Sequence, residues 1–220
     1  MKKKAIVLAG TRGIGRAIAD GLRDVVEELV VTGRSDLDTS DLEAVKRFAA
    51  LHPETDVLVL NTGGPPALPF DEITEELWTR YFHQLFLSFV LLLQRVHVRN
   101  GGHVILISSF HVREPGPKMA LSNSLRLAFI SVFKTASKTA MLRNVSFVNI
   151  APGPTRTDRL AELAAKSGRT IEDVADGLPT KRVVDPAEIG AFVRFLVEKD
   201  IHAMSGVTIP FDMGIGDFVL

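Results

Sequence analysis

Short apolar runs recur along the whole chain, separated by longer segments with a helical pattern. The runs consist mostly of branched residues and do not alternate apolar with polar positions, which indicates strands that are buried on both faces. Such strands are typical of a parallel sheet covered by helices. The predicted strands span 5–10, 28–33, 56–64, 103–109 and 145–153, with a last short strand at 207–211.

Helical segments fill the intervals between these strands. They span 14–24, 41–50, 74–99, 119–142 and 186 to about 199. Asp185 can cap the last of them, with Pro186 in its first turn. Because strand and helix alternate throughout, we predict right-handed βαβ units with helices on both faces of the sheet. The expected fold is one α/β domain over residues 1–220 with a doubly wound parallel sheet.

One edge of this sheet is predicted to be shortened. Only residues 34–41 separate the second strand from the next helix. A crossover needs about ten to twelve residues or more, so a complete third strand and its helix cannot fit there. We expect this unit to be missing or reduced to a stub near Asp36–Asp38.

Charge and composition argue against large anionic or lipid partners. The 220 residues are 46% apolar and 24% charged, and the formal net charge of zero gives no reason to expect nucleic acid or a membrane surface. The most apolar stretch, 85–98, is interrupted by Gln94, Arg95 and His97. It is also shorter than the roughly 20 residues of a membrane span. We therefore expect a cytoplasmic protein that acts on a small molecule.

Metal and thiol chemistry are not expected either. The chain contains no cysteine, which excludes disulfides, thiolate catalysis and cysteine-bound metals. Five of the histidines show no metal-ligand spacing with carboxylates, so we predict no metal site. They are His52, His83, His97, His103 and His202.

A glycine-rich turn follows the first strand. Its sequence, LAGTRGIG, places three glycines between a buried strand and a helix. Glycine permits a tight turn and a close approach to a pyrophosphate, and the helix N-terminus beyond it offers free N–H groups. We predict a dinucleotide-binding turn, and a tight turn without a ligand is the alternative. The predicted contact residues are Ala9, Gly10, Thr11, Arg12, Gly13, Ile14 and Gly15.

Two arginines favour NADP(H) over NAD(H) as the dinucleotide. NAD-binding sites commonly have an acidic residue at the end of the second strand, whereas this strand ends in Gly33 and Arg34. Arg34 and Arg12 could bind a 2′-phosphate, because guanidinium groups match phosphate oxygens in geometry and charge. Asp36 and Asp38 are close enough in sequence to keep NAD(H) open.

Four motifs together resemble the short-chain dehydrogenase/reductase family. AGTRGIG resembles the family's glycine-rich turn, and LNTGG at 60–64 resembles its Asn-Asn-Ala-Gly motif. Ser109 matches its catalytic serine, and APGPTRTD at 151–158 resembles its Pro-Gly motif. The resemblance covers nearly the whole chain and implies a Rossmann-like fold and an oxidoreductase with a nicotinamide cofactor. It adds the predicted cofactor contacts Asn61, Gly63, Pro152, Gly153, Thr155 and Thr157.

The chain departs from the family pattern at the residues that carry the chemistry. Family members place a tyrosine thirteen residues after the serine and a lysine four residues later, and these positions here hold Ser122 and Arg126. The only tyrosine, Tyr81, lies in another predicted helix, so no small shift of the alignment could make it the displaced tyrosine. Further departures are Leu8-Ala9 in place of Thr-Gly, and Leu60 and Leu85 in place of two asparagines.

The substituted pair leaves the role of proton donor open. Residues at i and i+4 share a helix face, so the resemblance implies that Arg126 keeps the lysine's hold on the nicotinamide ribose. Ser122 is a far weaker acid than a phenol, and general acid catalysis contributes about a hundred- to ten-thousandfold. His111, a water relayed through Ser122, or Arg126 itself could supply the proton. The candidate catalytic residues are Ser109, Ser122, Arg126 and His111.

Two main functions remain open from the sequence, beside cofactor-assisted isomerase or lyase chemistry. The first is an NADP(H)-dependent oxidoreductase that acts on a small carbonyl or alcohol with a non-standard proton donor. The second is a catalytically impaired NADP(H)-binding protein with a sensing or assembly role. Residues 154–182 are predicted to form a substrate lid. The helices at 74–99 and 119–142 are apolar on more than one face, which predicts a homodimer or homotetramer.

Overall fold

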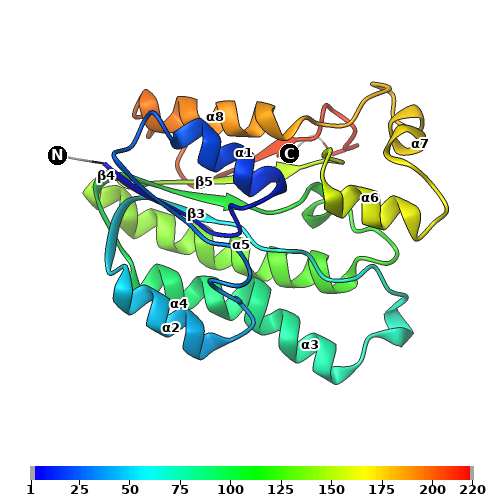
Figure 1. The fold of residues 1–220 in the computed structure, drawn as a ribbon, viewed down its shortest axis with the longest axis horizontal. Coiled ribbons are helices and arrows are strands. Elements are labelled where there is room, and N and C mark those ends of the chain that lie inside the picture. The colour runs from blue at the N-terminus through cyan, green and yellow to red at the C-terminus, as the bar shows by residue number, and fades with distance from the viewer. Residues whose placement is uncertain (1–2, 219–220) are drawn as a thin grey trace.

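A parallel sheet runs through the centre of the computed structural model, which describes residues 3–218 (Figure 1). Its strands are β1 (Lys4–Val7), β2 (Glu28–Val31), β3 (Glu54–Leu60), β4 (His97–Ile107), β5 (Ser146–Pro152) and β6 (Val207–Phe211). They are ordered β2-β1-β3-β4-β5-β6, and every neighbouring pair is parallel. The order reverses between β1 and β3, which opens a crevice at the carboxyl ends of the strands. The predicted Rossmann-like, doubly wound sheet is confirmed.

Helices cover both faces of the sheet, as the alternating pattern predicts (Figure 1). On one face lie α1 (Gly13–Leu22) and α8 (Pro186–Glu198). On the other lie α2 (Leu42–Leu51), α3 (Glu75–Phe82), α4 (Ser88–Arg95) and α5 (Ala120–Ala140). Two shorter helices, α6 (Asp158–Ala165) and α7 (Ile171–Asp176), lie beyond the carboxyl ends of the strands. Short 3₁₀ turns occur at Phe70–Glu72, Phe110–Val112 and Met141–Arg143.

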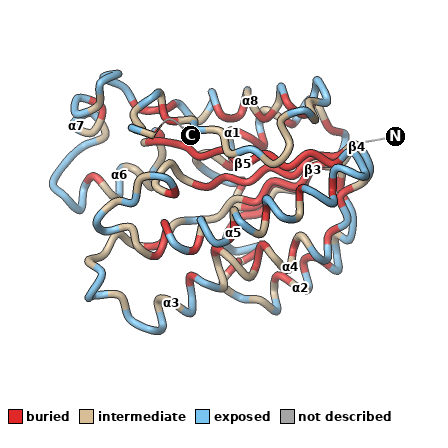
Figure 2. The backbone as a smooth tube through the Cα atoms, turned by 180° about the vertical axis from the view of Figure 1, so that it is seen from behind, coloured by how far each residue is buried: buried red, intermediate tan, exposed pale blue. Residues whose placement is uncertain are grey.

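Two apolar clusters, one on each face, hold the helices to the sheet. Successive residues of a strand point to opposite faces, so Ile6 packs with the cluster under α2, α4 and α5, while Val7 packs with the cluster under α1 and α8. Phe89 and Phe129 meet edge to face in the first cluster, with ring centroids 5.2 Å apart. Figure 2 shows that buried residues are concentrated in the strands, as their unbroken apolar runs predict.

The last helix begins where its sequence predicts. The Asp185 side chain accepts a hydrogen bond from the N–H of Ala187, and the Glu188 side chain accepts one from the N–H of Asp185. This reciprocal pair satisfies N–H groups that have no partner within the helix, and Pro186 fits the first turn because it has no N–H to satisfy.

The predicted single helix at 74–99 is wrong in two respects. A π-helical turn at His83–Leu87 divides it into α3 and α4, and α4 ends at Arg95. Residues 97–98 already pair with β3 as part of β4. Arg99 holds this junction through ion pairs with two acidic residues of β3. The change is hard to recognise in the sequence because buried apolar residues continue from the helix into the strand on both sides of Gln94, Arg95 and His97.

The shortened edge of the sheet is confirmed. β2 is the edge strand, and residues 32–41 run from it to α2 without forming a strand. Asp41 caps α2 by accepting hydrogen bonds from the N–H groups of Glu43 and Ala44.

Helices α3 and α5 carry the surface on which the oligomer prediction depends. Phe82 of α3 and Leu127 of α5 remain 40% and 53% exposed. Exposed apolar side chains fit a subunit interface, and the homodimer or homotetramer stays a prediction. Within residues 3–218, none of the helices combines the length and apolar character needed to cross a membrane.

Candidate active site

A cavity of about 650 Å³ lies at the carboxyl edge of the sheet. Loops that follow β1, β3, β4 and β5 form its walls together with parts of α3, α5 and α6. β1 and β3 end earlier than predicted, at Val7 and Leu60, and residues just after them line the cavity. Of the predicted site residues, the walls include Ala9, Thr11, Arg12, Gly13, Ile14, Arg34, Asn61, Gly63, Ser109, His111, Ser122, Arg126, Pro152, Gly153, Thr155 and Thr157.

Two predicted cofactor residues, Gly10 and Gly15, shape the turn instead of lining the cavity. A Cβ atom at Gly15 would lie 2.2 Å from the carbonyl oxygen of Ala9. One at Gly10 would lie 2.7 Å from Cγ1 of Val31. The chain packs too closely for a side chain at either position, so these glycines act by allowing the turn to fold.

Gly13 begins α1 and opens the turn toward the cavity. Its φ of +54° lies in the left-handed region that favours glycine. A Cβ atom here would lie 3.3 Å from Cγ2 of Thr157, so the turn meets the loop after β5 at this point. No side chain caps the N-terminus of α1, which leaves its first N–H groups and positive dipole end available to an anion.

Ala9 stands where the family pattern has glycine, and its backbone shows why. Its φ is +47°, a conformation that costs an L-residue about 1–2 kcal/mol. Nδ2 of Asn61 donates a hydrogen bond to the carbonyl oxygen of Ala9 at 3.3 Å. The turn therefore keeps a glycine-like backbone under strain, with Asn61 helping to hold it.

The loop after β2 carries the charged residues that bear on the choice between NADP(H) and NAD(H), and Arg34 and Asp38 of this loop line the cavity. Asp36 accepts a hydrogen bond from the N–H of Gly33 at 2.7 Å, so its carboxylate is engaged in the turn. Asp38 lies 3.3 Å from Nε of Arg34 and accepts hydrogen bonds from Ser40. Burial alone would raise the pKa of Asp38, but the hydrogen bonds from Ser40 and the charge of Arg34 together lower it. An ionised Asp38 thus balances part of the positive charge of Arg34.

Ser109 and His111 lie together just beyond β4. Oγ of Ser109 accepts a hydrogen bond from the N–H of His111 at 3.3 Å. Nδ1 of the His111 imidazole donates to the carbonyl oxygen of Glu114 at 3.0 Å, which fixes the ring against its own loop. The Ser109 hydroxyl therefore remains free to donate its hydrogen toward the cavity.

Ser122 and Arg126 lie one helical turn apart on the face of α5 that lines the cavity. Nε of Arg126 donates to Oγ of Ser122 at 3.3 Å, and Nη1 donates to the carbonyl oxygen of Ile107 at 3.0 Å. Burial, followed by the charge of Arg159, lowers the pKa of Arg126 to about 10. The guanidinium remains charged at neutral pH.

Tyr81 of α3 and Arg159 of α6 also line the cavity, and neither was predicted to do so. Tyr81 is 9% exposed, and its ring packs against Leu121 and Leu125 of α5. Although Tyr81 belongs to another helix than Ser122, it reaches the cavity because α3 packs against α5. One signal was available: Tyr81 precedes Leu85 by one helical turn, and the family pattern places an active-site asparagine at the position of Leu85.

The segment predicted to be a lid borders the cavity only in part. Its lining residues lie between 154 and 163, whereas α7 lies farther out (Figure 1). Closure of residues 154–182 over a substrate stays a prediction.

Comparison with known proteins identifies the family. A protein-family model described as Enoyl-(Acyl carrier protein) reductase matches residues 38–216. The chain belongs to the short-chain dehydrogenase/reductase family of oxidoreductases.

Two relatives show how far the sequence similarity to this short-chain dehydrogenase/reductase extends. The hydroxynaphthalene reductase-like protein Arp2 of Metarhizium guizhouense is 29% identical, over 94% of this chain and 92% of its own. The NADPH-dependent reductase BacG of Bacillus subtilis is 26% identical, over 97% of both chains. The crystal structure of L-sorbose reductase from Gluconobacter frateurii, complexed with NADPH and L-sorbose, shares the fold with a TM-score of 0.83. It is 21% identical over 99% of this chain and 98% of that one.

Apolar packing replaces two asparagines of the short-chain dehydrogenase/reductase pattern. Leu60 is fully buried in the cluster under α2, α4 and α5. Leu85 is 1% exposed and packs with Tyr81, Leu121 and Leu125. Neither position offers a polar group to the site, so any proton path must use other residues.

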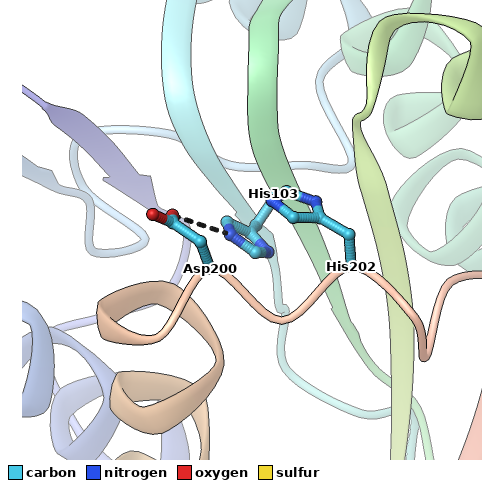
Figure 3. A group of neighbouring side chains, drawn as sticks. All are labelled: His103, Asp200 and His202. Atoms are coloured by element: carbon cyan, nitrogen blue, oxygen red, sulfur yellow. Dashed lines mark ion pairs between the residues drawn. The ribbon is translucent and has the colours of Figure 1, made fainter.

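A group of potential metal ligands lies at the amino edge of the sheet, opposite the cavity. His103, Asp200 and His202 meet there, although their spacing does not predict it (Figure 3). Nε2 of His103 lies 3.8 Å from Asp200, and the two imidazole rings stack 4.6 Å apart with their planes at 20°. One potential ligand atom of each residue lies within 4.8 Å of the other two, and Lys3 pairs with Asp200 at 2.8 Å. The absence of a metal site stays a prediction.

Proposed function

We propose that this protein is an NADP(H)-dependent oxidoreductase that interconverts a small carbonyl compound and its alcohol, with a proton donor other than the family's usual tyrosine. The observation that supports it is a shared cavity, because the glycine-rich turn, Ser109 and Arg126 all line one space. The relatives include an NADPH-dependent reductase, which is consistent with this class of reaction.

The residues present fit a nicotinamide dinucleotide. The uncapped N-terminus of α1 suits a pyrophosphate, and the missing side chain of Gly13 leaves room for it beside Thr157. Arg126 takes the position of the family lysine and would donate to the nicotinamide ribose. When bound, the reduced nicotinamide supplies a hydride to the carbonyl carbon of the substrate.

Reduction also requires a proton at the carbonyl oxygen, so that the C=O group becomes CH–OH. The Ser109 hydroxyl is free to donate a hydrogen bond to that oxygen. We assign the proton to Tyr81, which offers the same phenol as the family's tyrosine but from α3 instead of α5. Arg126 and Arg159 line the same cavity, where positive charge stabilises the negative charge that develops as the proton leaves.

The assignment of the proton donor can be tested with two variants. We expect Tyr81→Phe to lower kcat/KM by about a hundredfold or more and to leave NADPH affinity unchanged. His111→Asn is the matched comparison, because it removes the imidazole that is the alternative proton donor and keeps a hydrogen-bond donor at this position. Loss of activity in His111→Asn alone would assign the role to His111, and full activity in both variants would leave a water held by Ser122 or Arg126 itself as the donor.

We propose that NADP(H) is preferred because Arg12 and Arg34 line the corner beside β2. Charged hydrogen bonds contribute about 1.5–3 kcal/mol, so Arg34→Ala should weaken NADPH binding by about tenfold or more and leave NADH binding nearly unchanged. Asp38→Asn should strengthen NADPH binding, because it removes the charge that opposes the phosphate. Fluorescence titration of the purified variants with both dinucleotides measures these effects.

Binding and turnover together separate the two functions left open by the sequence. Tight NADPH binding with reduction of at least one compound in a carbonyl panel supports the oxidoreductase. Tight binding with no turnover on carbonyls or alcohols would instead indicate a catalytically impaired NADP(H)-binding protein. Failure to bind either dinucleotide would overturn both.

A further inference from the structure

Two guanidinium groups lie near each other on the wall of the cavity. Arg126 belongs to α5, and Arg159 belongs to the first turn of α6. Both line the cavity, and the charge of Arg159 acts on Arg126 strongly enough to shift its pKa. The two side chains come from different helices and line one space.

Arg126 has only neutral partners. Its two hydrogen bonds go to the hydroxyl of Ser122 and the carbonyl oxygen of Ile107. Among residues 3–218, no carboxylate contributes to its electrostatic environment, in which the one neighbouring charge is that of Arg159. Removing a cation from water without an opposite charge is unfavourable, so this arrangement favours an anion in the cavity.

Arg159 is only weakly neutralised. It donates to the carbonyl oxygen of Pro65 and lies 3.8 Å from Glu162, whose side chain is 58% exposed. Burial lowers the pKa of Arg159, and the charges of Glu162 and Tyr81 offset this only in part. An exposed carboxylate at that distance screens little of the charge that faces the cavity.

The position of Arg159 indicates the substrate rather than the cofactor phosphates. Its guanidinium lies beside Gly64 and Pro65 in the loop after β3, and the titratable groups that it interacts with are those of Glu162, Tyr81 and Arg126. The glycine-rich turn, which offers the phosphate site, meets the same segment at Thr157 instead. Arg159 therefore lies with the proposed proton donor.

We propose that the substrate carries a carboxylate, which Arg126 and Arg159 bind together, so that the natural compound is a small oxo acid or the matching hydroxy acid. This rests on the proposed function. Planar guanidinium groups pair with a carboxylate through two parallel hydrogen bonds, and a carboxylate between two cations removes their mutual repulsion. The limited cavity, which must also hold the nicotinamide, favours a small acid.

The test compares 2-oxobutanoate with 2-butanone, two four-carbon carbonyl compounds that differ by the carboxylate. We expect NADPH-dependent reduction of 2-oxobutanoate with a kcat/KM at least tenfold higher than that of 2-butanone. Arg159→Gln should lower this value at least tenfold more for the acid than for 2-butanone, because charged hydrogen bonds of about 1.5–3 kcal/mol are lost only with the anion. Arg159→Lys should restore part of the difference. Arg156→Gln, an exposed arginine of the same segment paired with Glu172, is the matched control and should change neither value.

Direct binding makes the result independent of turnover. Calorimetric titration of 2-oxobutanoate into protein saturated with NADP⁺ should show binding that Arg159→Gln weakens at least tenfold. Equal kcat/KM values for acid and ketone, or no binding of the acid, would overturn the carboxylate proposal. Reduction of 2-butanone under the same conditions would still support the proposed oxidoreductase function. Loss of NADPH affinity in Arg159→Gln equal to the loss for the acid would also overturn it and assign Arg159 to the cofactor. Acid binding without any turnover would support the anion site and contradict the proposed function.

Discussion

Arg126 at the carboxyl edge of the sheet and His103 at the amino edge are both basic side chains enclosed by protein. Burial is the main influence on each, and it lowers the pKa of Arg126 to about 10 and that of His103 to about 4. At neutral pH, Arg126 therefore keeps its charge, whereas His103 is a neutral imidazole. The second influence is also alike, since Arg159 opposes the charge on Arg126 and His202 opposes that on His103.

The different outcomes follow from the ordinary pKa values, since that of arginine lies far above neutral pH and that of histidine lies near 6.5. A similar environment removes the charge of a histidine and leaves that of an arginine. A retained, unpaired charge costs stability but can bind a ligand, whereas a neutral buried imidazole makes stability depend on pH. We therefore expect the carboxyl edge to bind a ligand and the amino edge to affect folding.

The largest expected effect is on stability in acid. An unfolded histidine titrates near pH 6.5 and folded His103 near pH 4, so the unfolded chain binds the extra proton between these values. The contribution of neutral His103 is fully present above pH 6.5 and falls by about 3 kcal/mol as the pH drops to 4. Urea unfolding at pH 7, 5.5 and 4.5 measures this fall.

Variants can distinguish the effect of His103 on acid stability from that of its charged neighbours. His103→Val should remove most of the fall between pH 6.5 and 4, whereas exposed His97→Gln should retain it. Asp200 affects stability over a lower pH range. Its contact with Lys3 lowers its pKa, so the stabilisation by ionised Asp200 is lost only below the ordinary pKa of an aspartate, near 4. If the free energy of unfolding of His103→Val still fell by the same amount between pH 6.5 and 4, neutral His103 would not be the cause of the acid sensitivity at the amino edge.

A smaller free-energy effect is expected at the other edge. Arg126→Gln should lower kcat/KM with NADPH by about a hundredfold, since a charged hydrogen bond contributes about 1.5–3 kcal/mol. Removal of an unpaired, desolvated charge should leave the free energy of unfolding unchanged or raise it. Kinetics and urea unfolding on the same preparation test both parts. A variant that unfolds easily and keeps its activity would reverse the comparison.

Relief of strain in the glycine-rich turn should have an effect below about 1 kcal/mol. Ala9→Gly removes the cost of φ +47° in an L-residue, but the unfolded chain gains flexibility in return. We expect a small rise in the free energy of unfolding and unchanged or tighter NADPH binding. Leu8→Thr, which restores the other half of the family pair without changing φ at position 9, is the control and should not stabilise the protein.

The smallest effect is expected from the surface ion pair beside His103. Lys3 and Asp200 are 38% and 57% exposed, and such pairs contribute about 0–1 kcal/mol. Lys3→Ala should therefore lower the free energy of unfolding at pH 7 by less than the fall between pH 6.5 and 4 that His103→Val removes. A loss above 2 kcal/mol would show that Lys3, rather than the neutral imidazole, governs the amino edge.

Much of the fold could be predicted because its signals are local. Strands that are buried on both faces appear as unbroken apolar runs, and Asp185 and Pro186 predict the start of α8. The ten residues between β2 and α2 cannot hold a further strand together with its crossover helix. The boundary at Arg95 could not be predicted, because apolar composition is the same in a buried helix and a buried strand. Only pairing with β3 and the ion pairs of Arg99 decide where the helix stops.

The sequence by itself determined the glycine-rich turn, the family and the helix face shared by Ser122 and Arg126, since each depends on neighbours along the chain. Only the tertiary structure decided that Tyr81 and Arg159 line the same cavity and that His103 stacks on His202. These contacts join elements whose separation is set by crossover helices, so spacing along the chain carries no information about them. The charge of Arg126 and the neutrality of His103 belong to the same class, because both depend on what surrounds the side chain after folding.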